Sequence, residues 1–239
     1  MRFFVVKNAK LATFSAIVLA VLVATFALCS PMIVYAARTT SEVPTIVIDA
    51  GHGGVDAGVV GKTTGMRESD LNLQIALLLG DVLKGAGYFV VYTRTNDTSL
   101  TLVKSDTRKR TDMFSRAKII NSAKADVVVS VHMNYFPSSS RRGAQVFFDR
   151  NDDASFRLAT AVQNSLNEIN LENMGREFSP LTAEKYILSC SQAASVIVEC
   201  GFLSNPADER LLETPEYKAL LAEKIAEGVK DFLKGETAG

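Results

Sequence analysis

The two histidines of this 239-residue chain both come directly after strand-like apolar runs. His52 lies in the stretch VIDAGHGGVDAG and His132 in the stretch VVVSVHMN. Two neutral imidazoles with one carboxylate are a common ligand set for a catalytic zinc ion, whose fourth position is left for water. Zinc suits nitrogen ligands better than magnesium or calcium, which prefer oxygen. The two histidines therefore indicate a zinc site, provided that a carboxylate lies near both.

Two glutamates are placed to complete such a site. Glu68 begins a helical pattern after the loop GVDAGVVGKTTGMR, and Glu199 ends the apolar run ASVIVEC. A bound zinc ion lowers the pKa of its water toward about 7 and polarises a carbonyl group. The second carboxylate can then act as general base and later protonate a leaving amine. Spacing alone does not settle this, because a histidine at a strand end is often an ordinary hydrogen-bonded residue. The glycines around His52 leave room for a ligand, although an ordinary tight turn needs them too.

The rest of the chain predicts strands that alternate with helices. Strand patterns cover residues 45–50, 88–94, 126–131, 143–149 and 194–200. Helical patterns cover residues 68–87, 110–124 and 153–169, and a last helix begins at Thr214-Pro215. This alternation, with strands apolar on both faces, is typical of a single α/β domain with a mostly parallel twisted sheet flanked by helices. Ligands bind beyond the carboxyl ends of such strands, so we expect His52, His132 and Glu199 at one edge of the sheet, with Glu68 beginning there too.

Residues 1–36 have the composition of a signal for export. Three basic residues precede an apolar stretch at 11–28, and a signal peptidase site follows with cleavage after Ala36. The stretch is almost long enough to span a bilayer, so an uncleaved anchor is the alternative, with membrane contact through residues 11–28 only. Residues 37–44 are interpreted as a linker and residues 45–236 as the catalytic domain. In either case the domain is expected outside the cytoplasmic membrane.

Charge and cysteine content narrow the choice of function. Removing the three basic residues of the signal from 26 basic and 26 acidic residues leaves 23 against 26, a net charge of about −3. There is no basic stripe, so a nucleic-acid partner is not expected. Cys190 and Cys200 can pair outside the cytoplasm, but their apolar surroundings favour free buried thiols. A cysteine hydrolase using Cys200 with His132 as base is disfavoured, because adjacent strand residues point to opposite faces.

Two further residues have roles that the sequence leaves open. Asp49 either orients His52, as carboxylates often do for zinc-bound imidazoles, or binds backbone amides at the strand end. Arg94, at the far end of a predicted strand, is expected to be structural. Neither residue is assigned a part in the chemistry.

Six stretches of the chain resemble, in order, the zinc-dependent N-acetylmuramoyl-L-alanine amidases. They are IVIDAGHGGVDAG, RESDLNLQIALLL, YFVVYTR, RTDMFSRAKIINSAKADVVVSVHMN, RGAQVFF and VIVECGFLSNPADERLL. The resemblance implies one α/β domain that cuts the amide between the lactyl group of N-acetylmuramic acid and L-alanine in peptidoglycan. Residue by residue, it implies that His52, Glu68 and His132 are the zinc ligands and that Glu199 is the catalytic glutamate.

A lone catalytic domain behind a signal segment is most similar to the spore-cortex, germination-specific branch of this family, which makes the precursor of muramic lactam. Ala194 and Cys200 depart from the proline and leucine of many members, and we interpret both as packing changes. The alternative is a catalytically silent domain that binds peptidoglycan in the envelope. That alternative predicts a missing ligand or a missing Glu199, and all four positions are filled. The sequence leaves open whether another protein activates the enzyme.

Overall fold

The computed structural model describes residues 43–101 and 107–237. The predicted signal or anchor segment at 1–36, and most of the predicted linker at 37–44, lie outside the described residues. The described residues belong to one compact unit that begins at Val43. The domain boundaries drawn from the sequence stay predictions. Among the described helices, none combines the length and the apolar character needed to cross a bilayer.

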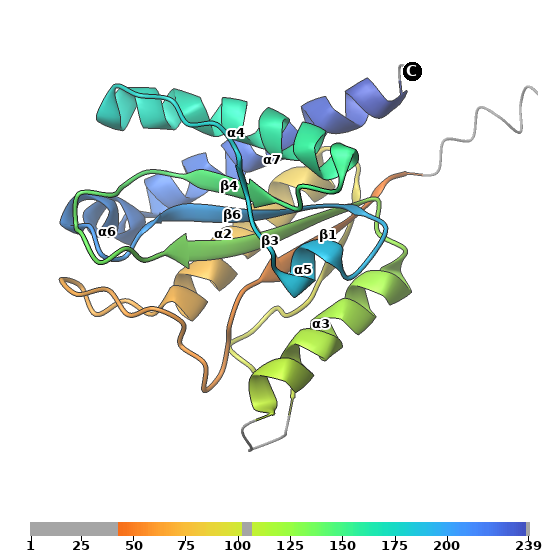
Figure 1. Ribbon diagram of the computed structural model, residues 1–239, viewed down its shortest axis with the longest axis horizontal. Coiled ribbons are helices and arrows are strands. Elements are labelled where there is room, and N and C mark those ends of the chain that lie inside the picture. The colour runs from red at the N-terminus through yellow and green to blue at the C-terminus, as the bar shows by residue number, and fades with distance from the viewer. Residues whose placement is uncertain (1–42, 102–106, 238–239) are drawn as a thin grey trace, which may run out of the picture. The chain divides into compact units, whose positions relative to one another are not determined.

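One sheet of six strands runs through the domain in the order β2-β1-β3-β6-β4-β5 (Figure 1). The strands are β1 (Thr45–Ala50), β2 (Phe89–Tyr92), β3 (Val127–Asn134), β4 (Gln145–Phe148), β5 (Leu181–Thr182) and β6 (Ala194–Phe202). The pairs β2-β1, β1-β3 and β3-β6 are parallel, whereas β4 is antiparallel to β6 and parallel to β5. The predicted α/β fold with a mostly parallel sheet is therefore confirmed. The central strands are rich in valine and isoleucine because helices cover the sheet on both sides.

The helices lie in two unequal layers. They are α2 (Glu68–Gly85), α3 (Arg108–Ala123), α4 (Asp153–Met174), α5 (Tyr186–Ser189), α6 (Pro206–Glu213) and α7 (Pro215–Thr237). One face of the sheet packs against α2, α4 and α7, which together form the larger apolar core. The other face packs against α3 and the short α5 (Figure 1). This second layer covers less of the sheet, so polar side chains near the strand ends remain accessible to solvent and ligands.

Strand alternation decides which side chains reach the less covered face. In β3, Val129 and Val131 belong to the larger core, whereas Val128 belongs to the smaller one. Because successive strand residues point to opposite faces, Ser130 and His132 lie on the same face as Val128. The sheet therefore uses one face for its main core and the carboxyl end of the other face for polar groups.

The structure differs from the sequence prediction in its short elements. The sequence predicted neither β5 nor α5, which have two and four residues and are too short to show a period. It also missed α6, although Asn205 followed by Pro206 is a usual helix start. In the structure, the Asn205 side chain accepts hydrogen bonds from the N–H groups of Ala207 and Asp208. The helix predicted at 153–169 continues to Met174.

The close packing of α4 against α7 gives a test of the fold. A Cβ on Gly228 would lie 2.4 Å from the Cα of Val162. We expect Gly228→Ala to lower the free energy of unfolding by about 1–3 kcal/mol, because the two helix backbones must move apart. Gly235→Ala in the same helix is the matched control, since its Cβ would meet nothing within 4 Å. Urea unfolding followed by circular dichroism measures both, and equal stability of the two variants would contradict this packing.

Candidate active site

His52 lies in a strained turn directly after β1. Its φ is 60°, in the left-handed region that costs a non-glycine residue about 1–2 kcal/mol. Its Nδ1 lies 3.0 Å from Oδ2 of Asp56, and its Nε2 lies 3.2 Å from Oε1 of Glu68. Asp56, which the sequence analysis did not single out, therefore orients the ring so that Nε2 faces Glu68.

Two buried arginines hold the backbone of this turn. Arg116 donates hydrogen bonds to the carbonyl of Ala50 at 2.8 Å and to that of His52 at 2.6 Å. Arg94 donates to the carbonyls of Ala50 and Gly51, both at 2.9 Å. Three successive carbonyls are thus fixed by two guanidinium groups. Arg94 acts on the backbone, as expected of a structural residue.

Asp49 supports the turn through Arg116. Its Oδ1 accepts hydrogen bonds from Arg116 at 2.5 Å and from Thr93 at 2.7 Å, and its Oδ2 accepts one from Ser130 at 2.6 Å. Burial raises the pKa of Asp49, but the charge of Arg116 and the two hydroxyl donors outweigh it and lower the pKa to about 2. Its hydrogen bonds go to these three side chains, not to the ring of His52 or to backbone amides. Both roles considered from the sequence are therefore replaced by an indirect one.

Glu68, the first residue of α2, lies between the two histidines. Its Oε1 is 2.9 Å from Nδ1 of His132. Two backbone N–H groups fix the carboxylate, with Val59 donating to Oε2 at 2.8 Å and Met133 donating to Oε1 at 3.2 Å. Burial raises the pKa of Glu68, but the hydrogen bonds from His132 and His52 hold it well below the usual range. The carboxylate therefore stays ionised.

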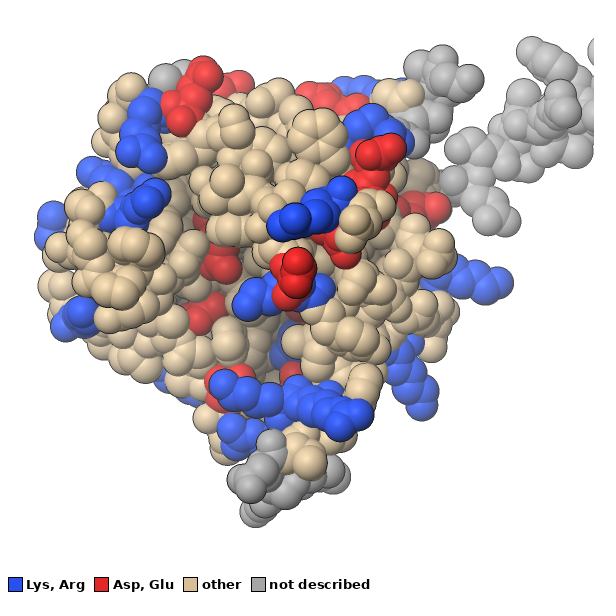
Figure 2. All heavy atoms as spheres, viewed as in Figure 1, with Lys and Arg blue, Asp and Glu red and all other residues tan. Residues whose placement is uncertain are grey.

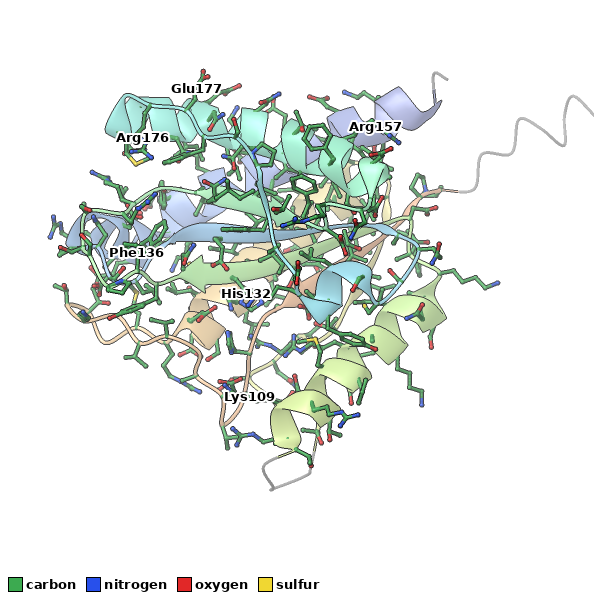
Figure 3. The ribbon with its side chains drawn as sticks, in the orientation of Figure 1. Lys109, His132, Phe136, Arg157, Arg176 and Glu177 are labelled. Carbon is green, nitrogen blue, oxygen red and sulfur yellow. The ribbon has the colours of Figure 1, made fainter. Side chains whose placement is uncertain are left out.

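His132 is brought to this point by close packing of its ring over Gly51. A Cβ on Gly51 would lie 2.2 Å from Cε1 of the ring, so only glycine fits there. The rings of His52 and His132 have centroids 5.1 Å apart and are inclined at 77°. Figure 3 shows His132 near the carboxyl end of β3, between the sheet and α3.

His52, Glu68 and His132 form a group that can hold a metal ion. Each offers one ligand atom, and these atoms all lie within 4.8 Å of one another. The two histidines also line a cavity of about 160 Å³ that is open to solvent on one side. Figure 2 shows a hollow near the middle of the molecule, with acidic atoms inside it and basic side chains on its rim. Two imidazole nitrogens and one carboxylate oxygen beside an open cavity fit a divalent metal ion with space beside it for a further ligand.

Glu199 lies beside His132 on the neighbouring strand. The two residues are directly paired in the register of β3 and β6, so their side chains share one face of the sheet. The Oε2 atom of Glu199 is buried without a hydrogen-bond partner in the described part of the chain. Burial raises the pKa of Glu199, the charge of His132 lowers it and that of Glu68 raises it again, to about 7. The surroundings thus move the pKa values of the two carboxyl groups in opposite directions.

Both cysteines of the described region are free. Cys200 is buried in the larger core, on the face opposite to Glu199. Burial raises the pKa of its thiol well above the usual range, which rules out a reactive thiolate. Cys190 is only half-buried, so the expectation of a buried thiol is right for Cys200 alone.

The residues that follow Glu199 hold the loops around the site. Ser204 accepts a hydrogen bond from the N–H of Phe136 at 3.0 Å. Glu209, at the start of α6, accepts bonds from the N–H and the hydroxyl of Thr64, at 2.9 and 2.8 Å. The segment that begins at Glu199 therefore contains one candidate catalytic group and residues that hydrogen-bond the loops of Phe136 and Thr64.

Comparisons with known proteins agree on one family. The family model described as N-acetylmuramoyl-L-alanine amidase matches residues 46–231. The chain is 34% identical over 191 residues to the germination-specific N-acetylmuramoyl-L-alanine amidase of Bacillus subtilis, covering 79% of each chain. It is 27% identical to the amidase AmiA of Escherichia coli, covering 79% of this chain and 75% of that one. The CwlD amidase of Clostridioides difficile, solved in complex with the GerS lipoprotein, superposes with a TM-score of 0.75 at 32% identity, covering 80% of this chain and 99% of that one.

Metal binding at this site is expected to depend on pH. Burial lowers the pKa of His52, but its bonds with Glu68 and Asp56 outweigh burial and raise it to about 9. A metal ion must displace this proton. Zinc affinity should therefore rise by about tenfold per pH unit as the pH rises to about 9, and level off above it. Titration against a chelator that buffers free zinc measures the affinity. An affinity that is independent of pH between about 6 and 9 would contradict zinc binding that displaces a proton from His52.

The contact between Gly51 and His132 gives a test in which none of the candidate ligand residues is substituted. We expect Gly51→Ala to lose about ten- to a hundredfold in zinc affinity, because the added methyl group displaces the His132 ring. Gly85→Ala, at the exposed end of α2, is the control because its Cβ would meet nothing within 4 Å. Zinc affinity, from titration against a chelator, is measured together with circular dichroism, which checks that both variants fold. Wild-type zinc affinity in a folded Gly51→Ala variant would contradict the predicted role of His132.

Proposed function

The chain belongs to the N-acetylmuramoyl-L-alanine amidase family, and we propose that it cuts peptidoglycan with a zinc ion held by His52, Glu68 and His132. The bond cut in this family joins the lactyl group of N-acetylmuramic acid to L-alanine of the stem peptide. In our proposal Glu199 is the general base and acid. One observation carries the proposal: two imidazoles and an ionised carboxylate converge beside a second carboxylate whose Oε2 has no partner in the described region.

Zinc is the metal that this donor set favours. Two nitrogen ligands argue against magnesium and calcium, which prefer all-oxygen sites. When bound, zinc supplies Lewis-acid chemistry: it polarises the amide carbonyl and makes water more acidic. The chain orients its ligands for this task, because Asp56 holds Nδ1 of His52 and backbone N–H groups hold Glu68. Such support of the ligands is usual at zinc sites.

Glu199 has the properties of a proton carrier. Its Oε2 is buried without a partner in the described region, and burial raises its pKa, which suits a group that both accepts and donates a proton. In the proposed reaction it accepts a proton from the attacking water and then donates one to the leaving amine of L-alanine. Glu68 is less suited to this part, because both of its oxygens already accept hydrogen bonds.

The biological substrate that we propose is spore-cortex peptidoglycan, where the cleavage prepares muramic-lactam formation. The proposal is supported by the similarity to the germination-specific amidase of Bacillus subtilis, along 79% of that protein. Such a substrate lies outside the cytoplasmic membrane, so we propose that the domain acts there. The related CwlD amidase was solved with a lipoprotein bound, which supports a protein partner for this chain as well.

Digestion of purified peptidoglycan tests the proposal. The zinc-loaded protein should release stem peptides that begin with a free L-alanine amine, and a chelator should abolish the release. Mass spectrometry of the products identifies the bond that is cut. A protein that binds zinc and peptidoglycan but releases no peptide would instead be the silent binding domain.

The two glutamates are distinguished by matched substitutions. Glu199→Gln should keep zinc but lose about two to four orders of magnitude in rate, because the positioned proton carrier is gone. Glu68→Gln should lose zinc, because a neutral amide replaces an anionic ligand between the two histidines. Zinc content and the rate of peptide release are measured on the same samples. If Glu199→Gln released zinc and Glu68→Gln kept it, the two assignments would be reversed.

A further inference from the structure

A larger groove adjoins the candidate active site on the side of β4 and β5. Its volume is about 870 Å³, within the range of about 300–1,000 Å³ that is usual for ligand sites. The groove begins at Asn134, two residues beyond His132, and at Gln145, which is paired with Glu199 across β4 and β6. The groove therefore begins beside the proposed reacting centre, where a bound substrate can extend into it.

Two arginines on the walls of the groove are positioned by aromatic rings. The guanidinium carbon of Arg141 lies 5.2 Å from the ring centroid of Phe136, and that of Arg176 lies 4.3 Å from the ring centroid of Phe178. Figure 3 shows Phe136 and Arg176 on either side of the start of β4. Within residues 43–101 and 107–237 neither arginine pairs with a carboxylate. A guanidinium stacked on a ring keeps its N–H donors available for a planar carboxylate.

The charge of the groove distinguishes it from the cavity around the histidines. That cavity is lined by three basic and three acidic side chains: Arg108, Lys109, Arg116, Asp49, Asp56 and Asp112. The groove is lined by three basic side chains and one acidic one: Arg141, Arg142, Arg176 and Glu172. Arg142 is paired with Asp208 at 3.3 Å, which leaves the groove with an excess of one positive charge. The groove itself therefore carries the charge that attracts an anionic ligand.

We propose that this groove binds the acidic stem peptide, with Arg141 and Arg176 as its carboxylate-binding residues. The inference rests on the proposed amidase function. It places the peptide part of the substrate on the β4 and β5 side of His52, Glu68 and His132. Cleavage separates a glycan from a peptide that carries free carboxylates, and only the peptide matches the charge of the groove. Phe147, Leu181 and Phe202 add an apolar surface for the alanine methyl groups.

The test compares two muramoyl peptides that differ only in charge: one has free stem-peptide carboxylates, and in the other these are amidated. The variant is R141Q/R176Q in the full-length, zinc-loaded chain. The control is R157Q, at the opposite end of α4 from Arg176 (Figure 3). KM and kcat are measured for each protein with each substrate.

Loss of the two charges should affect one substrate only. We expect R141Q/R176Q to raise KM for the free-carboxylate substrate about three- to tenfold at low salt, as for two exposed ion pairs, with kcat unchanged. KM for the amidated substrate should stay the same, and R157Q should behave as the wild type with both. An equal effect on both substrates, or none, would overturn the proposal. If the substitutions had no effect on either substrate, the groove would bind another ligand, such as a protein partner.

Failure of this inference can be told apart from failure of the proposed function. Calorimetry measures binding of the free stem peptide to the zinc-loaded chain without any cleavage. Peptide release that shows no dependence on carboxylate charge would reject the groove and leave the amidase function. Binding that requires Arg141 and Arg176, in a protein that releases no peptide, would reject the amidase function and leave the groove.

Discussion

The ion pair between Asp49 and Arg116 is buried, with both side chains 2% exposed, and the position of His52 depends on it. Removing two charges from water is costly and is offset only where further hydrogen bonds satisfy them. Here Ser130 and Thr93 bind the carboxylate, and the carbonyls of the turn bind the guanidinium. The same bonds satisfy backbone carbonyls that make a sharp turn instead of continuing a strand. The network therefore stabilises both the buried charges and the backbone of the turn, in which His52 has a left-handed conformation.

Strand β3 links this network to the candidate metal ligands. Ser130 binds Asp49, and His132, two residues later, binds Glu68. Both side chains share a face only because the side-chain period of a strand is two. A shift of one residue in register would turn both into the larger core and bring apolar residues to the site. Burial of Val129 and Val131 against the helices thus holds the polar residues between and after them in place.

The sequence was informative wherever a local pattern carried the information. Strands and long helices have a period, and His52, His132 and Glu199 could be placed together because parallel strands end at one edge. The resemblance supplied the individual roles. Asp56 is only four residues from His52, but it lies in a turn that no periodic pattern marks. Arg116 could not be found because its importance lies in a contact across the fold, 67 residues away at Asp49. The groove was missed for the same reason, since its walls come from separate segments between Asn134 and Phe202.

The two glutamates show how surroundings divide the work between identical side chains. Glu68 receives N–H groups from Val59 and Met133, which stabilise its charged form and hold it between the histidines. Glu199 projects from a strand whose own N–H groups are used by the sheet, and its Oε2 finds no donor in the described region. Burial without donors raises a carboxyl pKa, and donors lower it. Two carboxyl groups whose pKa values are shifted in opposite directions are suited to different tasks. One can hold a cation permanently, and the other can exchange a proton. The difference follows from where each residue lies, at a helix start or at a strand end, and not from its chemical type.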